Sequence, residues 1–264
     1  MEFQHPEPTG PMIAFALFAD AAPALDALAA SLEAEFGPVE TLTPVAAPAG
    51  AEAPTAPPAL VVTAQGATVL VAAIGTPAPG DPVRACHPVW WTDRSPVAEH
   101  RGHVLITVAR DPDDPVDHDT ALTDAVALSC VAAVVAEQPD AVALFHTNGA
   151  LTLPAPAYSR LVREAFDAGE LPVDAWVSVW LEPSDAGVTA FTLGLDAFGH
   201  AELSVADSAR EASEVYTLLT SVAAHLVASG DQLLPGASLG PSDEERYEVL
   251  APTDPDGHFL QIAF

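Results

Sequence analysis

Two histidines, His100 and His103, stand three residues apart in the stretch VAEHRGHVLITV, residues 97–108. An imidazole ring titrates near neutral pH, so either histidine could transfer a proton, with Glu99 or Asp93 orienting the ring. Cys86 and His87 precede the pair in the chain, and cysteine and histidine are the ligands that zinc prefers in tetrahedral sites. The sequence therefore offers a candidate polar site of His100, His103 and Glu99. It also offers a metal site with four candidate ligands, which are Cys86, His87, His100 and His103.

The spacing of these four residues favours structure over chemistry. Adjacent cysteine and histidine side chains cannot easily bind one ion together, and residues three apart in an extended strand point to opposite faces of a sheet. The two rings converge only if His100 lies in the loop before the strand. We expect instead that His103 begins a strand and bonds a neighbouring carbonyl or carboxylate, and that His100 and Glu99 lie near the surface. We expect no bound metal or other cofactor.

The absence of lysine excludes several enzyme classes. All eight basic residues are arginine, whereas P-loop phosphate binding, protein-kinase phosphoryl transfer and pyridoxal-phosphate chemistry each need a lysine amine. Cys130 lies within an apolar helical stretch, where a thiol acts as a small hydrophobic group. A hydrolase centred on His100 and His103 stays open as the alternative to a non-catalytic protein.

The charge balance indicates what kind of partner the protein binds. The chain has 37 acidic and 8 basic residues, which gives a formal net charge of −29. Such a surface repels nucleic-acid phosphates and anionic lipids, and it attracts basic proteins. We therefore expect a non-catalytic protein-binding module with a basic protein partner, such as an effector that it neutralises, and no binding to nucleic acid or membrane.

Two features of the chain predict a cytoplasmic protein. We see no apolar stretch of the eighteen or so residues needed to cross a bilayer. Residues 1–11 lack the basic head and apolar body of a secretion signal. We interpret them as a flexible tail that precedes a single domain over residues 12–264.

Hydrophobic periodicity predicts helices set among hairpins. We expect a strand at 12–18, a helix at 20–37, a hairpin at 59–64 and 67–74 that turns at Gln65-Gly66, and a short helix within 82–93. Further along, the expected elements are a strand at 103–110, helices at 120–137 and 155–168, a strand at 141–147, three strands between 172 and 206, a helix after 208, and two C-terminal strands. Residues 38–58, which are rich in proline and alanine, form an expected insertion in the domain.

These elements predict an α+β fold, with helices packed on a mixed, largely antiparallel sheet. A pair of related half-domains stays open as an alternative arrangement. Helix caps are expected from Asp20, from Asp117 or Asp119, and from a capping box that Ser208 and Glu211 form.

Three stretches resemble an uncharacterised, mainly bacterial family known as domain of unknown function 4261. They are WTDRSPVAEHRGH (91–103), in which Gly102 replaces the family's usual alanine, LPVDAWV (171–177), and FTLGLDAFGHAEL (191–203). A weaker likeness covers PGASLG (235–240). The positions that match the family's pattern are Trp91, Trp176, Thr192, Gly194, Phe198, Gly199 and Glu202. The resemblance implies no activity.

The motif at residues 191–203 is expected to be a turn between strands. Gly194 and Gly199 permit a turn or a bulge, and Phe198 anchors in the core. Glu202 is expected to bond a backbone donor or to pair with an arginine. Trp176 and Trp180 share strand parity, which predicts a broad aromatic face that packs in the core or, if it is exposed, binds a partner.

Overall fold

The structure is a computed structural model, and it describes residues 6–9, 12–43, 57–111, 113–240, 246–252 and 258–264. The chain divides into two compact units. We call residues 11–114 and 123–172 the seven-stranded unit, and residues 1–10, 115–122 and 173–264 the six-stranded unit. Both combine helices with strands that pair mostly antiparallel, so the expected α+β class is confirmed.

The sheet of the seven-stranded unit has the order β2-β3-β4-β5-β1-β6-β7, and all of its neighbouring strands run antiparallel. Its strands are β1 (Ile13–Phe18), β2 (Glu40–Leu42), β3 (Ala59–Ala64), β4 (Ala67–Ile74), β5 (Gly102–Val108), β6 (Ala141–His146) and β7 (Leu151–Pro154). Strand β1, which lies between β5 and β6, is almost fully buried, as its continuous apolar sequence predicts.

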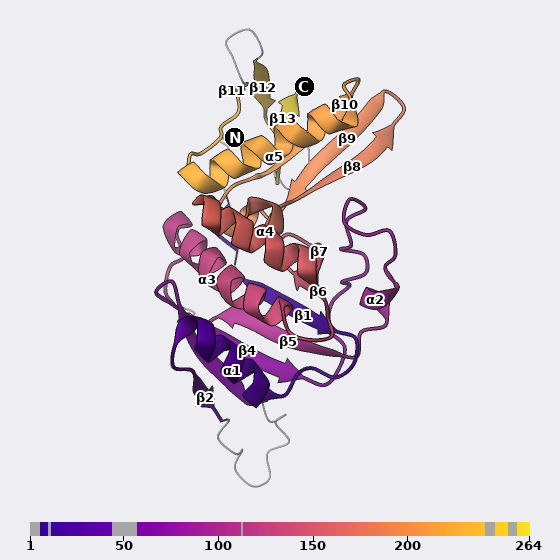
Figure 1. The fold of residues 1–264 in the computed structure, drawn as a ribbon. Coiled ribbons are helices and arrows are strands. Elements are labelled where there is room, and N and C mark those ends of the chain that lie inside the picture. The colour runs from indigo at the N-terminus through magenta and orange to yellow at the C-terminus, as the bar shows by residue number, and fades with distance from the viewer. Residues whose placement is uncertain (1–5, 10–11, 44–56, 112, 241–245, 253–257) are drawn as a thin grey trace, which may run out of the picture. The chain divides into compact units, whose positions relative to one another are not determined.

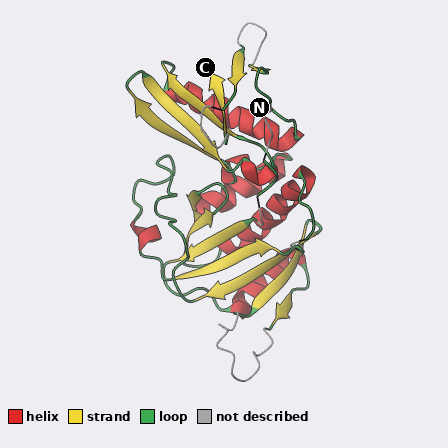
Figure 2. Ribbon diagram, turned by 180° about the vertical axis from the view of Figure 1, so that it is seen from behind, coloured by secondary structure: helices red, strands yellow, loops and turns green. Residues whose placement is uncertain are grey.

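Three helices cover one face of this sheet: α1 (Leu25–Phe36), α3 (His118–Ala136) and α4 (Ala155–Ala168) (Figure 1). Figure 2, seen from behind, shows the strands in front of these helices. Among the described residues, α3 is the one helix that is long and apolar enough to cross a membrane, so the expectation that no stretch reaches this length is wrong. Two thirds of its most apolar window lies buried inside the protein, which is typical of a core helix.

The hairpin of β3 and β4 is confirmed at its expected bounds. Its turn residues, Gln65 and Gly66, both have positive φ, at 49° and 82°. Two consecutive residues with positive φ make the kind of turn whose twist matches that of the flanking strands. A glycine in the second position adopts this conformation without steric cost.

Of the caps expected for the first two long helices, one is absent from the structure and one is confirmed. Asp20 does not cap α1, since the N-cap is Ala24 and no side chain bonds the first turn. The extended segment before the helix instead leaves Asp20 3.9 Å from Arg101. In α3 the cap is Asp117, whose carboxylate accepts the N–H of Thr120 at 2.9 Å.

The long connection between β4 and β5 packs on the sheet face that Phe15 and Leu17 share, away from Ala14 and Ala16 of the same strand. The short helix expected within 82–93 does not form. Turns occupy this segment, and one four-residue helix, α2 (Ser95–Ala98), follows it. Pro82 and Pro88 interrupt the segment, and proline disfavours helical geometry in the residue before it.

The six-stranded sheet has the order β11-β12-β13-β10-β9-β8, with one parallel pair, β10 and β13. Its strands are β8 (Ser178–Ser184), β9 (Gly187–Leu193), β10 (Glu202–Ser208), β11 (Ser238–Leu239), β12 (Tyr247–Leu250) and β13 (Phe259–Ala263). Helix α5 (Ala212–Ser229) contacts β8, β9 and β10, and it buries the stripe that contains Val215, Leu219 and Val222. The described residues of this unit also form two short 3-10 helices, η1 (Val173–Ala175) and η2 (Asp196–Phe198).

The capping box of α5 is one turn later than expected. Glu211 is the N-cap and Glu214 is its partner at the third helical position. Ser208 lies in β10, where its hydroxyl donates to the carbonyl of Phe264 at 3.1 Å and accepts the N–H of Arg210 at 3.2 Å. The box requires an acceptor at the N-cap, and the carboxylate of Glu211 supplies it in place of a serine hydroxyl.

The two expected irregular segments are described only in part. Within the tail, the N–H of Thr9 donates to the carbonyl of Asp196 at 3.2 Å, so this part of the tail contacts η2. Within the insertion at 38–58, residues 40–42 form β2, which pairs with β3. Residues 1–5, 10–11 and 44–56 lie outside the described residues.

Candidate functional site

The ring of His100 is bonded to the backbone through both of its nitrogens. Nε2 accepts the N–H of Ala78 at 2.8 Å, and Nδ1 lies 2.6 Å from the carbonyl oxygen of Val97. Because a carbonyl only accepts, Nδ1 carries the proton and the ring is neutral. The expectation that His100 lies near the surface is wrong, since its residue is only 8% exposed. Glu99 is exposed, as expected.

His103 makes a second bond to the start of the loop that connects β4 to β5. It is buried in β5, and its Nδ1 donates to the carbonyl of Thr76 at 2.7 Å. Its ring meets the ring of Phe15 edge-on, with 5.4 Å between centroids. Burial lowers the pKa of His103, an effect that the bond to Thr76 opposes and that nearby His100 reinforces. The two histidines therefore fasten the end of the loop between β4 and β5 to the start of that loop, at Thr76 and Ala78.

Position 102, between these histidines, accepts only glycine in this conformation. A Cβ atom added to Gly102 would lie 2.3 Å from the backbone nitrogen of Ala22. The glycine that replaces the family's usual alanine thus allows the backbone at position 102 to lie close to the backbone at Ala22.

Cys86 and His87 are also engaged locally. The thiol of Cys86 is buried 3.4 Å from the carbonyl of Pro82, and burial raises its pKa to about 11. A thiol with such a pKa is a poor nucleophile at neutral pH. Nδ1 of buried His87 accepts the N–H of Val89 at 3.3 Å. In the described part of the chain, no three His, Cys, Asp or Glu side chains group in a way that could hold a metal ion.

Trp91 anchors this loop to the sheet. Its indole N–H donates to the carbonyl of Thr152 in β7 at 2.7 Å, and the hydroxyl of Thr152 donates to Pro82 at 2.8 Å. The ring packs against a core cluster from β1, β6 and the loop. The cluster consists of Phe15, Leu17, Ala85, Cys86, Val97, Ala143 and Phe145.

Trp176 and Trp180 do not share a strand face, because β8 begins only at Ser178. Trp176 follows η1, lies buried and approaches the ring of Phe198, with 5.6 Å between centroids. Trp180 is half-buried in β8, and its indole N–H donates to the hydroxyl of Ser178 at 2.9 Å. The predicted strand began too early because the apolar run of η1 continues directly into that of β8.

Glu202 organises the family motif through a buried carboxylate. One oxygen accepts the N–H groups of Gly194, Leu195 and Asp196 at 2.6, 2.9 and 3.3 Å, which caps the turn that leads into η2. The other oxygen accepts the hydroxyl of Thr192 at 2.6 Å. We expected Glu202 to bond either a backbone donor or an arginine, and in the structure its partners include three backbone N–H groups.

Burial raises the pKa of Glu202 to about 7, although the hydroxyl of Thr192 opposes this shift. A carboxyl with a pKa near neutrality is typical of a general acid or base. Its oxygens already accept four hydrogen bonds, and it is only 7% exposed. The geometry therefore supports a structural role.

The remaining motif positions surround the same turn. Gly194 and Gly199 have φ values of 114° and 79°, which only glycine adopts readily. Phe198 is buried, and its carbonyl accepts a hydrogen bond from Nδ1 of His118 at 3.1 Å. The motif thus builds one rigid connection between β9 and β10.

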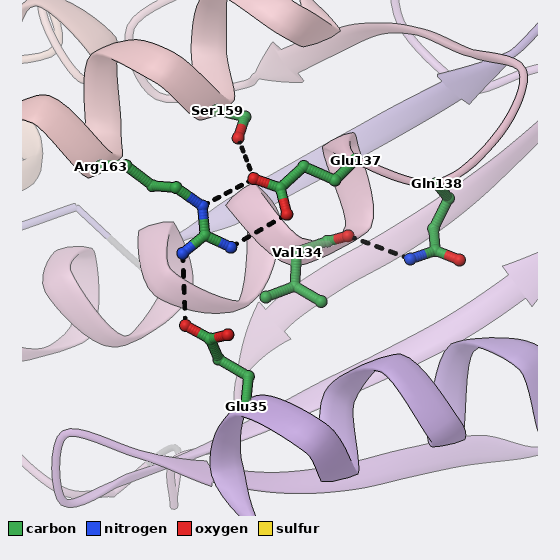
Figure 3. Close-up of polar contacts among 6 residues, drawn as sticks. All are labelled: Glu35, Val134, Glu137, Gln138, Ser159 and Arg163. Carbon is green, nitrogen blue, oxygen red and sulfur yellow. Dashed lines mark hydrogen bonds and ion pairs between the residues drawn. The ribbon is translucent and has the colours of Figure 1, made fainter.

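Arg163 joins three helical segments of the seven-stranded unit (Figure 3). Its guanidinium donates two hydrogen bonds to Glu137, just after α3, at 2.6 and 2.9 Å, and one to Glu35 of α1 at 3.2 Å. Ser159 of α4 donates to the same Glu137 oxygen at 2.5 Å. Both carboxylates raise the pKa of Arg163, and Arg163 lowers that of Glu137. Each of these side chains bonds another member of the set, so together they link α1 and α4 to the end of α3.

One groove in the six-stranded unit has the composition of a ligand site. It encloses about 730 Å³ between α5, β11, Tyr247 and Phe264, which lies within the range of small-molecule pockets. Arg210 and His225 line it as well. The sequence prediction did not include this groove, because its walls come from segments distant in the chain. The spacing of Ser213, Thr217 and Ser221, four residues apart, could have shown one polar stripe of α5.

Residues 191–259 match the model of the family described as domain of unknown function 4261. This confirms the expected resemblance for the stretch that contains Thr192, Gly194, Phe198, Gly199 and Glu202. No curated protein and no solved structure matches the chain.

Proposed function

We propose that the protein is a non-catalytic cytoplasmic module that binds a basic protein through its acidic surface. The observation that carries the proposal is the charge balance. With 37 acidic and 8 basic residues, at least 29 carboxylates have no basic residue of the chain to pair with. Complementary charge on a partner would raise the association rate and would be screened by salt.

The six-stranded unit supplies the surface that we assign to this partner. It contains only two of the eight arginines, Arg210 and Arg246. Three exposed acidic residues form what we call the acidic rim, namely Glu182, Asp185 and Asp207.

The sheet register brings two members of the rim together. Glu182 in β8 pairs with Thr189 in β9, and the hydroxyl of Thr189 accepts the N–H of Asp207 in β10 at 3.2 Å. Asp185 lies in the turn between β8 and β9. The rim therefore presents negative charge from β8, from the turn that follows β8, and from β10.

The engagement of the histidines supports a non-catalytic role. Three of the four ring nitrogens of His100 and His103 bond backbone groups. A hydrolase would need one of these nitrogens to face its substrate, and the residue that carries the fourth, Nε2 of His103, is only 3% exposed. No observation on the described residues favours the hydrolase alternative.

Capture from a native lysate tests the proposal. The wild-type protein is immobilised beside a rim variant, E182Q/D185N/D207N, and a matched control, D26N/E33Q/E40Q, which removes three exposed charges from the seven-stranded unit. Retained proteins are identified at about 0.1 M and about 1 M salt, between which the Debye length falls from about 10 Å to about 3 Å.

We expect a basic protein that the wild type and the control retain at low salt, and that the rim variant and high salt release. Retention of no basic protein at either salt concentration would contradict the proposed function. Equal retention by the rim variant and the wild type would contradict the assignment to the acidic rim.

A further inference from the structure

The groove on α5 has an apolar side and a hydroxyl side. Helix residues four apart share one face, so Ser213, Thr217 and Ser221 form a polar stripe along the groove. The apolar side of the groove has aliphatic and aromatic members from both walls. They are Leu218, Val222, Leu239, Tyr247 and Phe264.

Arg210 supplies a positive charge at one end of this groove. Its guanidinium carbon lies 5.2 Å from the centre of the Phe264 ring, and its backbone N–H donates to the hydroxyl of Ser208 at 3.2 Å. The ring of Phe264 in turn meets Tyr247 edge-on at 4.6 Å. These contacts position the cation against the aromatic wall.

Arg210 has no carboxylate partner in the part of the chain that the structure describes. The arginine ion pairs among those residues belong to Arg101, Arg110 and Arg163. The groove thus combines an apolar wall, a row of hydroxyl groups and a guanidinium. A guanidinium forms its strongest hydrogen bonds with anions such as carboxylate and phosphate, so we look for an anion as the ligand's polar end.

The charge of the surroundings selects the class of anion. Glu214 also lines the groove, and its carboxylate accepts the N–H of Glu211 at 3.3 Å. A phosphate carries close to two negative charges at neutral pH, whereas a carboxylate carries one. The carboxylate of Glu214 repels the doubly charged phosphate more than a singly charged carboxylate, and the guanidinium fork of Arg210 matches the planar carboxylate.

We propose that this groove binds a small amphipathic carboxylic acid. Its carboxylate bonds the guanidinium of Arg210, and its apolar body lies against Phe264, Tyr247 and Leu239. This ligand site shares no residue with the acidic rim, so the proposal does not depend on the basic partner.

Titration with octanoate and with octan-1-ol tests the site, since the two probes share an alkyl chain and differ in charge. Binding is followed by amide chemical shifts of the whole protein. We expect shifts at α5 and β11, and an affinity for octanoate about ten-fold higher than for the alcohol, which is the usual effect of one charged hydrogen-bonded pair.

Three variants separate charge from packing. R210Q should bind both probes with equal affinity, and R210K should keep part of the preference for octanoate. L239S should lower the affinity for both probes by the same factor. R84Q, which removes an exposed arginine from the other unit, is the matched control and should behave as wild type. Melting temperatures confirm that each variant is folded.

Equal affinity of the wild type for the two probes would overturn the proposal. So would an undiminished octanoate preference in folded R210Q, or shifts that lie away from α5 and β11. Capture of a basic protein by R210Q should match that of the wild type, so failure of one proposal leaves the other standing.

Discussion

The carboxylate of Glu202 accepts the backbone N–H of Gly194 at 2.6 Å, and thereby ties the first residue of β10 to the turn that follows β9. The same oxygen accepts two more N–H groups, which makes one side chain the cap of the whole connection. Removal of this carboxylate would leave several buried donors without an acceptor.

We therefore expect Glu202→Ala to lower the free energy of unfolding by about 3 kcal/mol or more, because each buried donor left unsatisfied costs about 1–3 kcal/mol. Glu202→Gln should cost less, since its amide oxygen still accepts the backbone N–H groups. Urea denaturation of both variants measures this difference. Equal stability of the alanine variant and the wild type would contradict the capping role.

The raised pKa of Glu202 predicts a specific dependence of stability on pH. The native carboxyl holds its proton to about pH 7, whereas an ordinary glutamate loses it near 4.5. Between these values the native state binds more protons than the unfolded state, so stability falls as pH rises, by about 3 kcal/mol in all. The difference in stability between wild type and Glu202→Gln should change across this window, and a constant difference would contradict the prediction.

His146 predicts the opposite dependence in the seven-stranded unit. Burial lowers its pKa from 6.5 to about 4, and its Nε2 lies 3.0 Å from the hydroxyl of Tyr158. Its contribution is fully present above pH 6.5 and is lost as pH falls through about 4, a change of about 3 kcal/mol. His146→Gln should remove this acid sensitivity. Denaturation curves of both proteins between pH 7 and 4 check it, and parallel pH profiles would count against it.

Sequence patterns predicted elements well where one local pattern determines them. The helix at 155–168 and the hairpin at Gln65-Gly66 form at their expected bounds. The misplaced caps at Asp20 and Ser208 have a different cause. Each residue type suits a cap, but the chain path beyond the helix decides whether the side chain reaches it.

The candidate site could be predicted only in part. The local alternation of apolar residues predicted a strand that begins at His103, and β5 begins one residue earlier, at Gly102. The burial of His100 depends on Ala78, which lies twenty-two residues away on the returning loop. The groove beside Arg210 depends on Tyr247 and Phe264, whose approach to α5 no local pattern indicates.

Two arginine pairs should differ in their contribution to stability. Arg110 forms a two-bond pair with Asp124, whose side chain is only 5% exposed, whereas Arg163 and Glu137 are each at least 40% exposed. Arg110→Ala leaves a buried carboxylate without its partner, which costs about 3–5 kcal/mol. Arg163→Ala should cost about 1 kcal/mol or less, because water screens the exposed pair. Equal losses in chemical denaturation would contradict this ranking.

Salt should stabilise the protein. Repulsion among the excess carboxylates destabilises the compact state, and at about 1 M salt the Debye length is only about 3 Å. We expect the melting temperature to rise by several degrees between dilute buffer and about 1 M salt, and to rise less in E182Q/D185N/D207N. A flat or falling melting temperature would show that the carboxylates do not repel one another appreciably.

The central claim is that His100 and His103 hold a loop in place and bind neither substrate nor metal. The melting temperature of H100L/H103L, measured beside wild type with added zinc and with a chelator, tests it most directly. We predict that the variant melts several degrees lower, because Ala78, Val97 and Thr76 lose their partners, and that neither zinc nor chelator moves the wild type. A variant as stable as the wild type, or a wild-type melting temperature that falls with the chelator, would contradict the claim.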